Sequence, residues 1–178
     1  MDINETVIGN NTHSSKLLLP FTQGVHEHAL EYAVLLAKNR HAVLVPCSLI
    51  YVPRNARGAR LESIQQSKDF QALVQSKASK YGVALEAREV YTSNVIASIQ
   101  CMTQAMDSNS IILFVCNGDG VLLSTNEVKH ILTLVPGQHH VIRLQRNASH
   151  LSLNPFKHIA RMLPGHRKEH MLSGTSLL

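Results

Sequence analysis

Four residues that follow the most apolar run of the chain have types and spacing suited to holding a phosphate. The run covers residues 111–115, and Gly118, Gly120, Ser124 and Thr125 come after it. A buried strand that passes through a glycine turn into a helix directs free backbone N–H groups and the helix dipole at one point, which favours anions. The same residues also fit a tight turn followed by a capping box between Ser124 and Glu127. We favour the turn and capping box.

A second candidate is the basic loop after the second predicted strand, which contains Arg54, Arg57 and Arg60. In a doubly wound sheet this loop lies at the edge where ligands bind, and guanidinium groups suit phosphates through their paired N–H donors. The two alternatives are an anionic ligand, such as a mononucleotide or a cyclic dinucleotide, and a solvated loop without a ligand. We favour the solvated loop.

Metal binding and catalysis are not expected. Of the eleven histidines, His166 and His170 are four apart, but no cysteine or acidic ligands accompany them. His26 and His28 would point to different faces of a helix, and His139 and His140 to opposite sides of a strand. A nucleophile elbow, paired acids and a Walker lysine are all missing from the sequence. We therefore predict no metal site, no catalytic residue and no enzyme.

The three cysteines are far apart and lack metal spacing. Cys47 and Cys116 fall in predicted strands, and Cys101 falls in a predicted helix. We expect all three to be small buried hydrophobic residues in a reducing compartment.

The elements that would position these residues alternate along the chain. Apolar runs predict strands at residues 16–21, 43–52, 83–91, 110–115 and 140–144, and helical periodicity predicts a helix after each of the first four. Alternation of this kind predicts an α/β fold in one domain: a doubly wound parallel sheet of five strands with helices on both faces.

Several details of these elements are also predicted. Pro46 lies early in the second strand and suggests an irregularity or bulge there. The expected core faces of the helices are Val25, Ala29, Tyr32, Ala33 and Leu36 for the first, residues from Leu61 to Tyr81 for the second, Ile96 to Met106 for the third, and Val128, Ile131, Leu132 and Val135 for the fourth.

Length and charge divide the chain into three parts. The 178 residues suit one domain at 16–144, preceded by a flexible leader at 1–15 and followed by a basic tail at 145–178. The tail holds five Lys or Arg residues and one acid, so it supplies +4 of the net +5. It is interpreted first as a solvated end, then as a contact with a membrane surface or partner, and last as a nucleic-acid contact.

Two classes of protein are disfavoured by composition. Aromatic residues make up 4% of the chain, which argues against a base-stacking platform for nucleic acid. A signal peptide and a long apolar run are both missing from the sequence, so a cytoplasmic location is expected.

The chain resembles the universal stress protein domain from Lys16 to about Arg143. The resemblance lies in LLLPF at residues 17–21, HALEYAVLLAKNRHAVL at 28–44, KYGVALEAREVYTSNVIASIQCMTQAMDSNSIILFVC at 80–116 and HHVIRL at 139–144. It implies a fold like that of the adenine-nucleotide alpha hydrolases, and pairing of two chains through the last strand.

This chain departs from the ATP-binding members of that family at most positions of their motif. Thr22 stands where an acid is expected, and Cys116 stands where the first glycine is expected. Three residues separate Gly120 from Ser124, whereas the family spacer has about nine, and Ser124 replaces the last glycine. The resemblance therefore implies a divergent member without the full ATP-binding motif.

Two functions are weighed. The first is a dimeric regulatory or scaffold domain with a degenerate nucleotide site, attached to or acting with a transport or signalling system by analogy with similar domains. Its expected dimer edge is Val141, Ile142, Arg143 and Leu144.

The alternative is a sensor that binds ATP, AMP or cyclic di-AMP at the carboxyl edge of the sheet. The expected ligand-binding residues are Phe21, Thr22, Ser48, Arg54, Arg57, Cys116, Asn117, Gly118, Gly120, Ser124 and Thr125. Weak nucleotide hydrolysis is a third and weaker possibility.

Overall fold

The computed structural model describes residues 15–106 and 110–145. The expected leader and basic tail lie outside this part of the chain, apart from Ser15 and Gln145. The elements are β1 (Lys16–Phe21), α1 (Glu27–Asn39), β2 (Val43–Tyr51), α2 (Leu61–Tyr81), β3 (Arg88–Thr92), α3 (Val95–Ala105), β4 (Ser110–Cys116), β5 (Asp119–Val121), α4 (Thr125–Leu134) and β6 (Gln138–Leu144).

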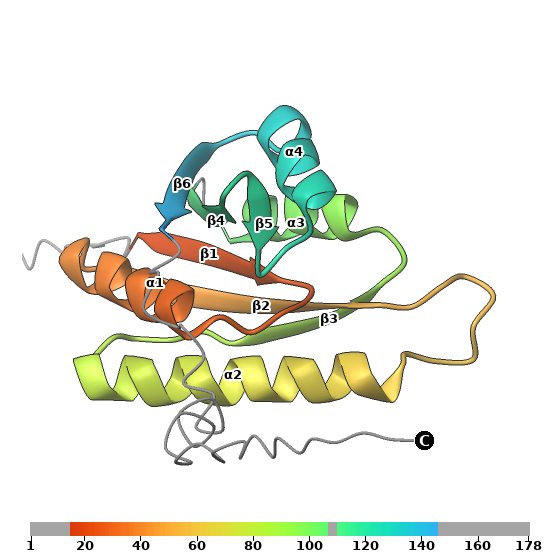
Figure 1. Cartoon of the computed structure of the whole chain (residues 1–178), viewed down its shortest axis with the longest axis horizontal. Helices are drawn as coiled ribbons and strands as arrows, with labels where there is room; N and C mark the ends of the chain where they lie inside the picture. Colours follow the sequence, from red (N-terminus) through yellow and green to blue (C-terminus); the bar gives the residue numbers. More distant parts are fainter. Residues whose placement is uncertain (1–14, 107–109, 146–178) are drawn as a thin grey trace, which may run out of the picture. The chain divides into compact units, whose positions relative to one another are not determined.

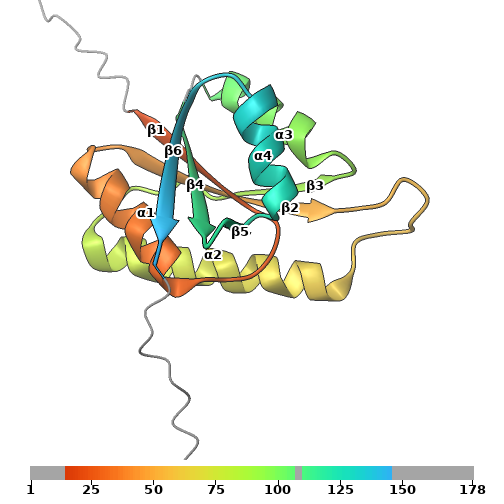
Figure 2. The ribbon, with the colours of Figure 1, turned by 45° about the horizontal axis from the view of Figure 1, so that its top comes forward.

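Five of the six strands form the predicted parallel sheet, in the spatial order β3-β2-β1-β4-β6 (Figures 1 and 2). The sequence did not predict β5, which runs antiparallel to β4. The third strand is also shorter than predicted, because β3 begins at Arg88 and only an isolated bridge joins Leu85 to Leu44. The last strand begins two residues earlier than predicted, at Gln138.

Helices cover both faces of the sheet, as predicted, and each face has its own core. Leu17 and Leu19 of β1 pack with α1 and α2, whereas Leu18 packs with α3 and α4 on the other face. Figure 2 shows the two helix pairs on opposite sides of the strands. In the first core, the rings of Phe21 and Phe70 stack with their centroids 4.2 Å apart and their planes within 8°. This contact fixes the carboxyl end of β1 against α2.

Four large apolar side chains that were expected in the core are exposed. Tyr32 is 54% exposed because α1 buries the stripe of Ala29, Leu30, Ala33, Val34 and Ala37, which lies further round the helix. Leu61 is 84% exposed because the core contacts of α2 begin one to two turns later. Leu132 is 42% exposed, beside the buried Ile131 of α4. Val25 precedes α1 and is also exposed.

The irregularity expected at Pro46 lies in the neighbouring segment rather than in β2. β2 pairs with β1 without a break, with Pro46 opposite Leu19. Leu44 donates its N–H to Ala84 on the β3 side, and alternation along the strand turns the nitrogen of Pro46 to that same side. The segment on that side, residues 86–87, is not in a strand. The missing N–H of Pro46 therefore costs β2 no hydrogen bond to a neighbouring strand.

The helix ends follow from local sequence. Asn94 caps α3 by accepting a hydrogen bond from the N–H of Ala97, and His26 caps α1 by accepting one from Ala29. Gly82 ends α2 with a φ of 67°, the left-handed conformation that glycine adopts without strain.

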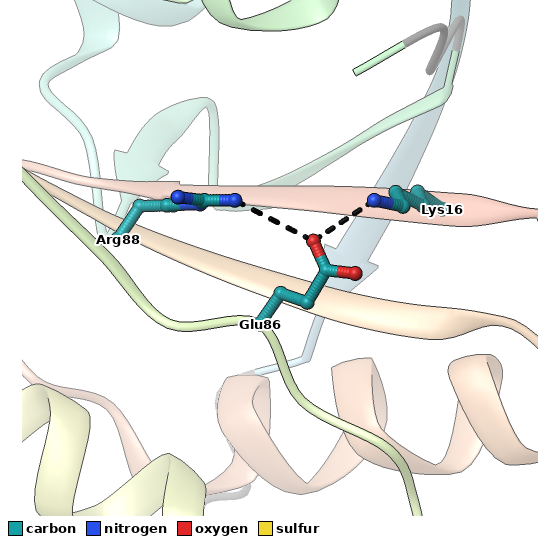
Figure 3. A network of polar contacts seen from close by, with 3 residues as sticks. All are labelled: Lys16, Glu86 and Arg88. Atoms are coloured by element: carbon teal, nitrogen blue, oxygen red, sulfur yellow. Dashed lines mark hydrogen bonds and ion pairs between the residues drawn. The ribbon is translucent and has the colours of Figure 1, made fainter.

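A small ionic network joins β1 to the segment before β3 (Figure 3). The Glu86 carboxylate lies 2.9 Å from the Lys16 ammonium and 3.7 Å from the Arg88 guanidinium. All three side chains are partly exposed, so we assign the network a modest stabilising role.

Candidate functional site

In a sheet of this order, ligands bind at the carboxyl ends of β1 and β4, where the chain reverses the direction in which it adds strands. β1 and β4 pair only at their first residues, Leu17 with Ser110 and Leu18 with Ile111. Beyond these pairs the two strands separate. A crevice between their carboxyl ends is therefore the place where a nucleotide would be expected.

β5 occupies this crevice. β6 pairs with β4 along its whole length, so β5 must lie at the opposite edge of β4, on the side of β1. The carbonyl of Leu122 accepts hydrogen bonds from the N–H groups of Thr22 at 2.8 Å and Gln23 at 3.2 Å. The end of β1 is thus bonded to the end of the β4–β5 hairpin, and the backbone spans the crevice.

The Leu122 side chain packs into the core beneath these hydrogen bonds between β1 and the hairpin. It is 3% exposed and belongs to the same core cluster as Phe21. Its φ of 71° is unusual for a residue with a bulky side chain, so the surrounding contacts must hold it there.

The hairpin itself is made by the dipeptide Asn117-Gly118. Their φ values are 53° and 90°, and positive φ at both central residues is typical of the two-residue turns that match the twist of a hairpin. Asn-Gly is the strongest short hairpin signal in a sequence, so β5 was predictable from these two residues. The tight turn favoured from the sequence is thus present, as the turn of a hairpin.

Gly120 allows the hairpin to approach the start of α4. A Cβ atom at this position would lie 2.4 Å from the Leu123 carbonyl oxygen, so a side chain cannot be accommodated without movement of the backbone. The Gly120 N–H donates to the Thr125 hydroxyl at 3.0 Å, and that hydroxyl lies 3.4 Å from the Asp119 carboxylate. The groups expected to bind a phosphate here are bonded to one another.

Glu127 lies at the N-terminus of α4, where a phosphate would be held. Its Oε2 atom accepts hydrogen bonds from the Thr22 hydroxyl at 2.8 Å and from the Ser124 N–H at 2.7 Å. The Ser124 hydroxyl accepts from the Glu127 N–H, which completes the predicted capping box. The carboxylate thus places a negative charge at the positive end of the helix.

Two further predicted ligand residues are buried in the core on the α2 side. Phe21 is stacked on Phe70, and Ser48 is fully buried. The Ser48 hydroxyl accepts a hydrogen bond from the Gln71 amide nitrogen at 3.1 Å. The structure therefore separates these two side chains from the surface on which a ligand would bind.

Arg54 and Arg57 lie on the exposed loop between β2 and α2. Neither makes a hydrogen bond or ion pair with the other residues that the structure describes. The structure does not bring them to the hairpin.

Two open hollows lie near the hairpin. One of about 440 Å³ is formed by residues 23–26 and 120–123. The other, of about 840 Å³, is lined among the described residues by Val115, Asn117, Gly118, Arg143, Leu144 and Gln145. Two of the predicted ligand residues, Asn117 and Gly118, therefore meet at the second hollow with Arg143 and Leu144 of the predicted dimer edge.

β6 is an edge strand of the described domain and contains residues 141–144, the expected dimer edge. Its side chains alternate: Ile142 and Leu144 pack against the core on the α1 side, whereas Val141 is 45% exposed. At the start of the strand, the Nε2 atom of His140 lies 3.1 Å from a guanidinium nitrogen of Arg40, the C-cap of α1. This contact joins β6 to α1.

The cysteines differ from one another more than predicted. Cys47 is buried in β2, and burial raises the pKa of its thiol to about 12. Cys116 is half-buried, but Cys101 is exposed on the outer side of α3, which corrects the expectation that all three are buried.

Among the described residues no group of histidine, cysteine and acidic side chains is arranged to hold a metal ion. None of the described helices is both long enough and apolar enough to span a bilayer.

No protein-family model matches the chain, and no curated protein matches it. Several solved structures match the chain. The universal stress protein from Archaeoglobus fulgidus in complex with dAMP aligns with a TM-score of 0.56 and 14% identity, over 72% of this chain and 97% of that one. A universal stress protein in complex with cAMP aligns with a TM-score of 0.52 and 10% identity, over 73% and 97% of the two chains.

A universal stress protein family protein from Arabidopsis thaliana with AMP bound aligns with a TM-score of 0.50 and 12% identity, over 80% of this chain and 98% of that one. Identities this low establish the arrangement of the backbone and nothing about ligands. These likenesses agree with the strand order, the two helix layers and the resemblance noted in the sequence. The chain therefore has the fold of the universal stress proteins.

Proposed function

We propose that this chain is a regulatory or scaffold domain of the universal stress protein type whose own residues close the nucleotide crevice. The observation that carries the proposal is the Glu127 carboxylate, which takes up the Thr22 hydroxyl and the Ser124 N–H at the helix end where a phosphate would lie. Leu122 and the β5 hairpin reinforce it, because they occupy the crevice with backbone and apolar side chain.

The proposed domain works as a homodimer, paired through residues 141–144. Support comes from the half-exposed Val141 on a strand with an open edge, since such an edge is usually covered. A dimer without a ligand would act by binding another protein, and a transport or signalling system is the proposed partner by analogy.

Calorimetric titration of the nucleotide-free protein with ATP, AMP and cyclic di-AMP tests the proposal. We expect no heat of binding at ligand concentrations up to about 1 mM, where a micromolar site would be saturated. Micromolar binding of any of the three that is weakened by Thr125→Ala would refute the closed crevice. The matched control is Thr133→Ala, because Thr133 is an exposed hydroxyl on the same helix that bonds only to carbonyls within α4.

The second candidate function is a sensor of adenine or cyclic nucleotides. It is favoured by the hollow beside Asn117, Gly118 and Arg143, which offers a guanidinium and backbone groups at the carboxyl edge of the sheet. Neighbours of the same fold are solved with dAMP, cAMP and AMP. In this case Arg143→Gln would weaken nucleotide binding, whereas Thr125→Ala would not.

Nucleotide hydrolysis remains a third candidate function, and turnover of ATP by the purified protein would be required for it.

A further inference from the structure

The loop between β2 and α2 is a cationic surface that the proposed crevice does not use. It spans residues 52–60 and holds Arg54, Arg57 and Arg60, all exposed, with no acidic residue among them. A turn in which the Ala56 N–H bonds to the Pro53 carbonyl sets Arg54 near its tip. In Figures 1 and 2 the loop extends outward beyond the neighbouring strand ends of the described domain.

The positive charge of this loop is not neutralised by the rest of the described domain. The three guanidinium groups form no hydrogen bond or ion pair with other described residues. The nearest acids along the chain are in α2, and each accepts a hydrogen bond from a glutamine one turn away: Glu62 from Gln66, and Asp69 from Gln65. The arginines are therefore available to an external anion.

Large apolar side chains flank these charges. Leu61, the first residue of α2, is 84% exposed and is the most exposed large apolar residue of the described domain. Tyr51, at the other end of the loop, is 54% exposed. Cationic side chains beside leucine and an aromatic residue are typical of surfaces that lie in the interface of an anionic bilayer.

We infer that the 52–60 loop, with Tyr51 and Leu61 at its base, docks on an anionic phospholipid surface. The arginines bind the lipid phosphates through paired N–H groups, and Leu61 enters the boundary between headgroups and acyl chains. A nucleic acid offers the arginines the same phosphates but gives Leu61 nothing apolar to contact. A projecting loop suits a deformable plane, whereas a rigid protein partner would need a matching cleft.

The expected effect of the loop is large enough to measure. A basic residue near an anionic membrane strengthens binding by about fivefold, so three together contribute about 100-fold. The contribution falls as salt is added, because exposed charges are screened over about 8 Å at physiological ionic strength.

The test is co-sedimentation of the full chain with vesicles of phosphatidylcholine alone and of phosphatidylcholine with about one third phosphatidylglycerol. The basic residues after 145 are present in every variant, so differences report the loop. The loop variant is Arg54→Gln with Arg57→Gln and Arg60→Gln. The matched control is Lys68→Gln with Lys80→Gln and Lys129→Gln, which removes three exposed charges from helices.

We expect binding to the anionic vesicles only, about 100-fold weaker for the loop variant and at most a few-fold weaker for the control variant. Leu61→Ser should weaken binding to the anionic vesicles by about fivefold without changing the thermal unfolding temperature. The inference is overturned if loop and control variants bind alike, or if Leu61→Ser has no effect. It is also overturned if the loop variant loses affinity for a single-stranded RNA but keeps its affinity for vesicles.

Discussion

The hydroxyl of Thr22 donates a hydrogen bond to the carboxylate of Glu127 at 2.8 Å, across 105 residues of sequence. This bond joins the end of β1 to the first turn of α4 over the crevice in which a nucleotide would be expected to bind. A carboxylate in that place satisfies the donors that would otherwise be offered to a phosphate. In the proposed function, these internal contacts take the place of a ligand while the fold is retained.

The Thr22–Glu127 pair should contribute measurably to folding. Glu127→Ala removes the capping box and the bond to Thr22, so we expect the free energy of unfolding to fall by about 2 kcal/mol. Thr22→Val should cost about 1 kcal/mol, and a double-mutant cycle measured by urea unfolding should give a coupling of about 1 kcal/mol. Glu62→Ala is the control, because exposed Glu62 accepts a hydrogen bond from Gln66 alone among the described residues, and its loss should change stability by less than about 0.5 kcal/mol. Independent, additive effects of the two substitutions would contradict the bridge.

Gly120 and Gly58 should respond in opposite ways to alanine. At Gly120 the new Cβ would lie 2.4 Å from a backbone oxygen, so we expect a loss of about 2–3 kcal/mol as the hairpin is displaced. At Gly58 nothing lies within 4 Å and φ is not in the left-handed region, so alanine should be neutral or stabilise by about 0.5 kcal/mol. Thermal and urea unfolding of the two variants measure this difference, and equal effects would show that the hairpin does not pack closely on α4.

The partial burial of His140 and its contact with Arg40 should make stability depend on pH. Burial, then the charges of Arg40 and His139, lower the pKa of His140 below its ordinary value of 6.5. The unfolded chain therefore binds a proton more readily. The stabilisation is complete above pH 7 and is lost as the pH falls below about 6.5 towards the folded-state pKa.

Urea unfolding measured between pH 7.5 and 5.5 checks the sign of this dependence. His140→Asn should flatten the profile in that window. His41→Asn is the matched control, because His41 is exposed and has a φ of 50°, which asparagine tolerates. A slope of the opposite sign in the unsubstituted protein would contradict the assignment.

The cysteines should differ in reactivity. Exposed Cys101 should react with a thiol reagent at pH 7 in the folded protein, whereas Cys47, with its pKa raised to about 12 by burial, should react only after unfolding. Counting the thiols that react before and after addition of guanidinium chloride tests this. Cys101→Ser should abolish the fast phase, and a fast phase that survives in Cys101→Ser but disappears in Cys47→Ser would contradict the structure.

The parts of the fold that depend on local sequence could be predicted. Leu17 to Phe21 form a strand because the run is apolar throughout, and α2 ends at Gly82 because glycine readily adopts the left-handed φ found there. The capping box of Ser124 and Glu127 was also visible, because both partners lie within one turn.

The parts that depend on distant contacts could not be predicted. Nothing near Glu127 in the sequence identifies Thr22 as its second donor. Tyr32 and Leu132 are exposed because neighbouring residues take the core positions, which only the packing of the helices decides. Pro46 lies in a continuous strand because the segment beside it is not in a strand at that point, and that requires knowledge of the register. The Asn117-Gly118 turn, by contrast, is a local signal from which the hairpin can be predicted.

The most direct test of the closed crevice is a nuclear magnetic resonance titration of the nitrogen-15-labelled protein with AMP. The informative signals are the backbone amides of Gly120, Leu122 and Ser124, which line the crevice between β1 and β4. The closed crevice predicts that these signals stay in place up to about 5 mM AMP in the unsubstituted protein. Saturable shifts of these amides at micromolar AMP would show that the nucleotide enters the crevice and would contradict the account.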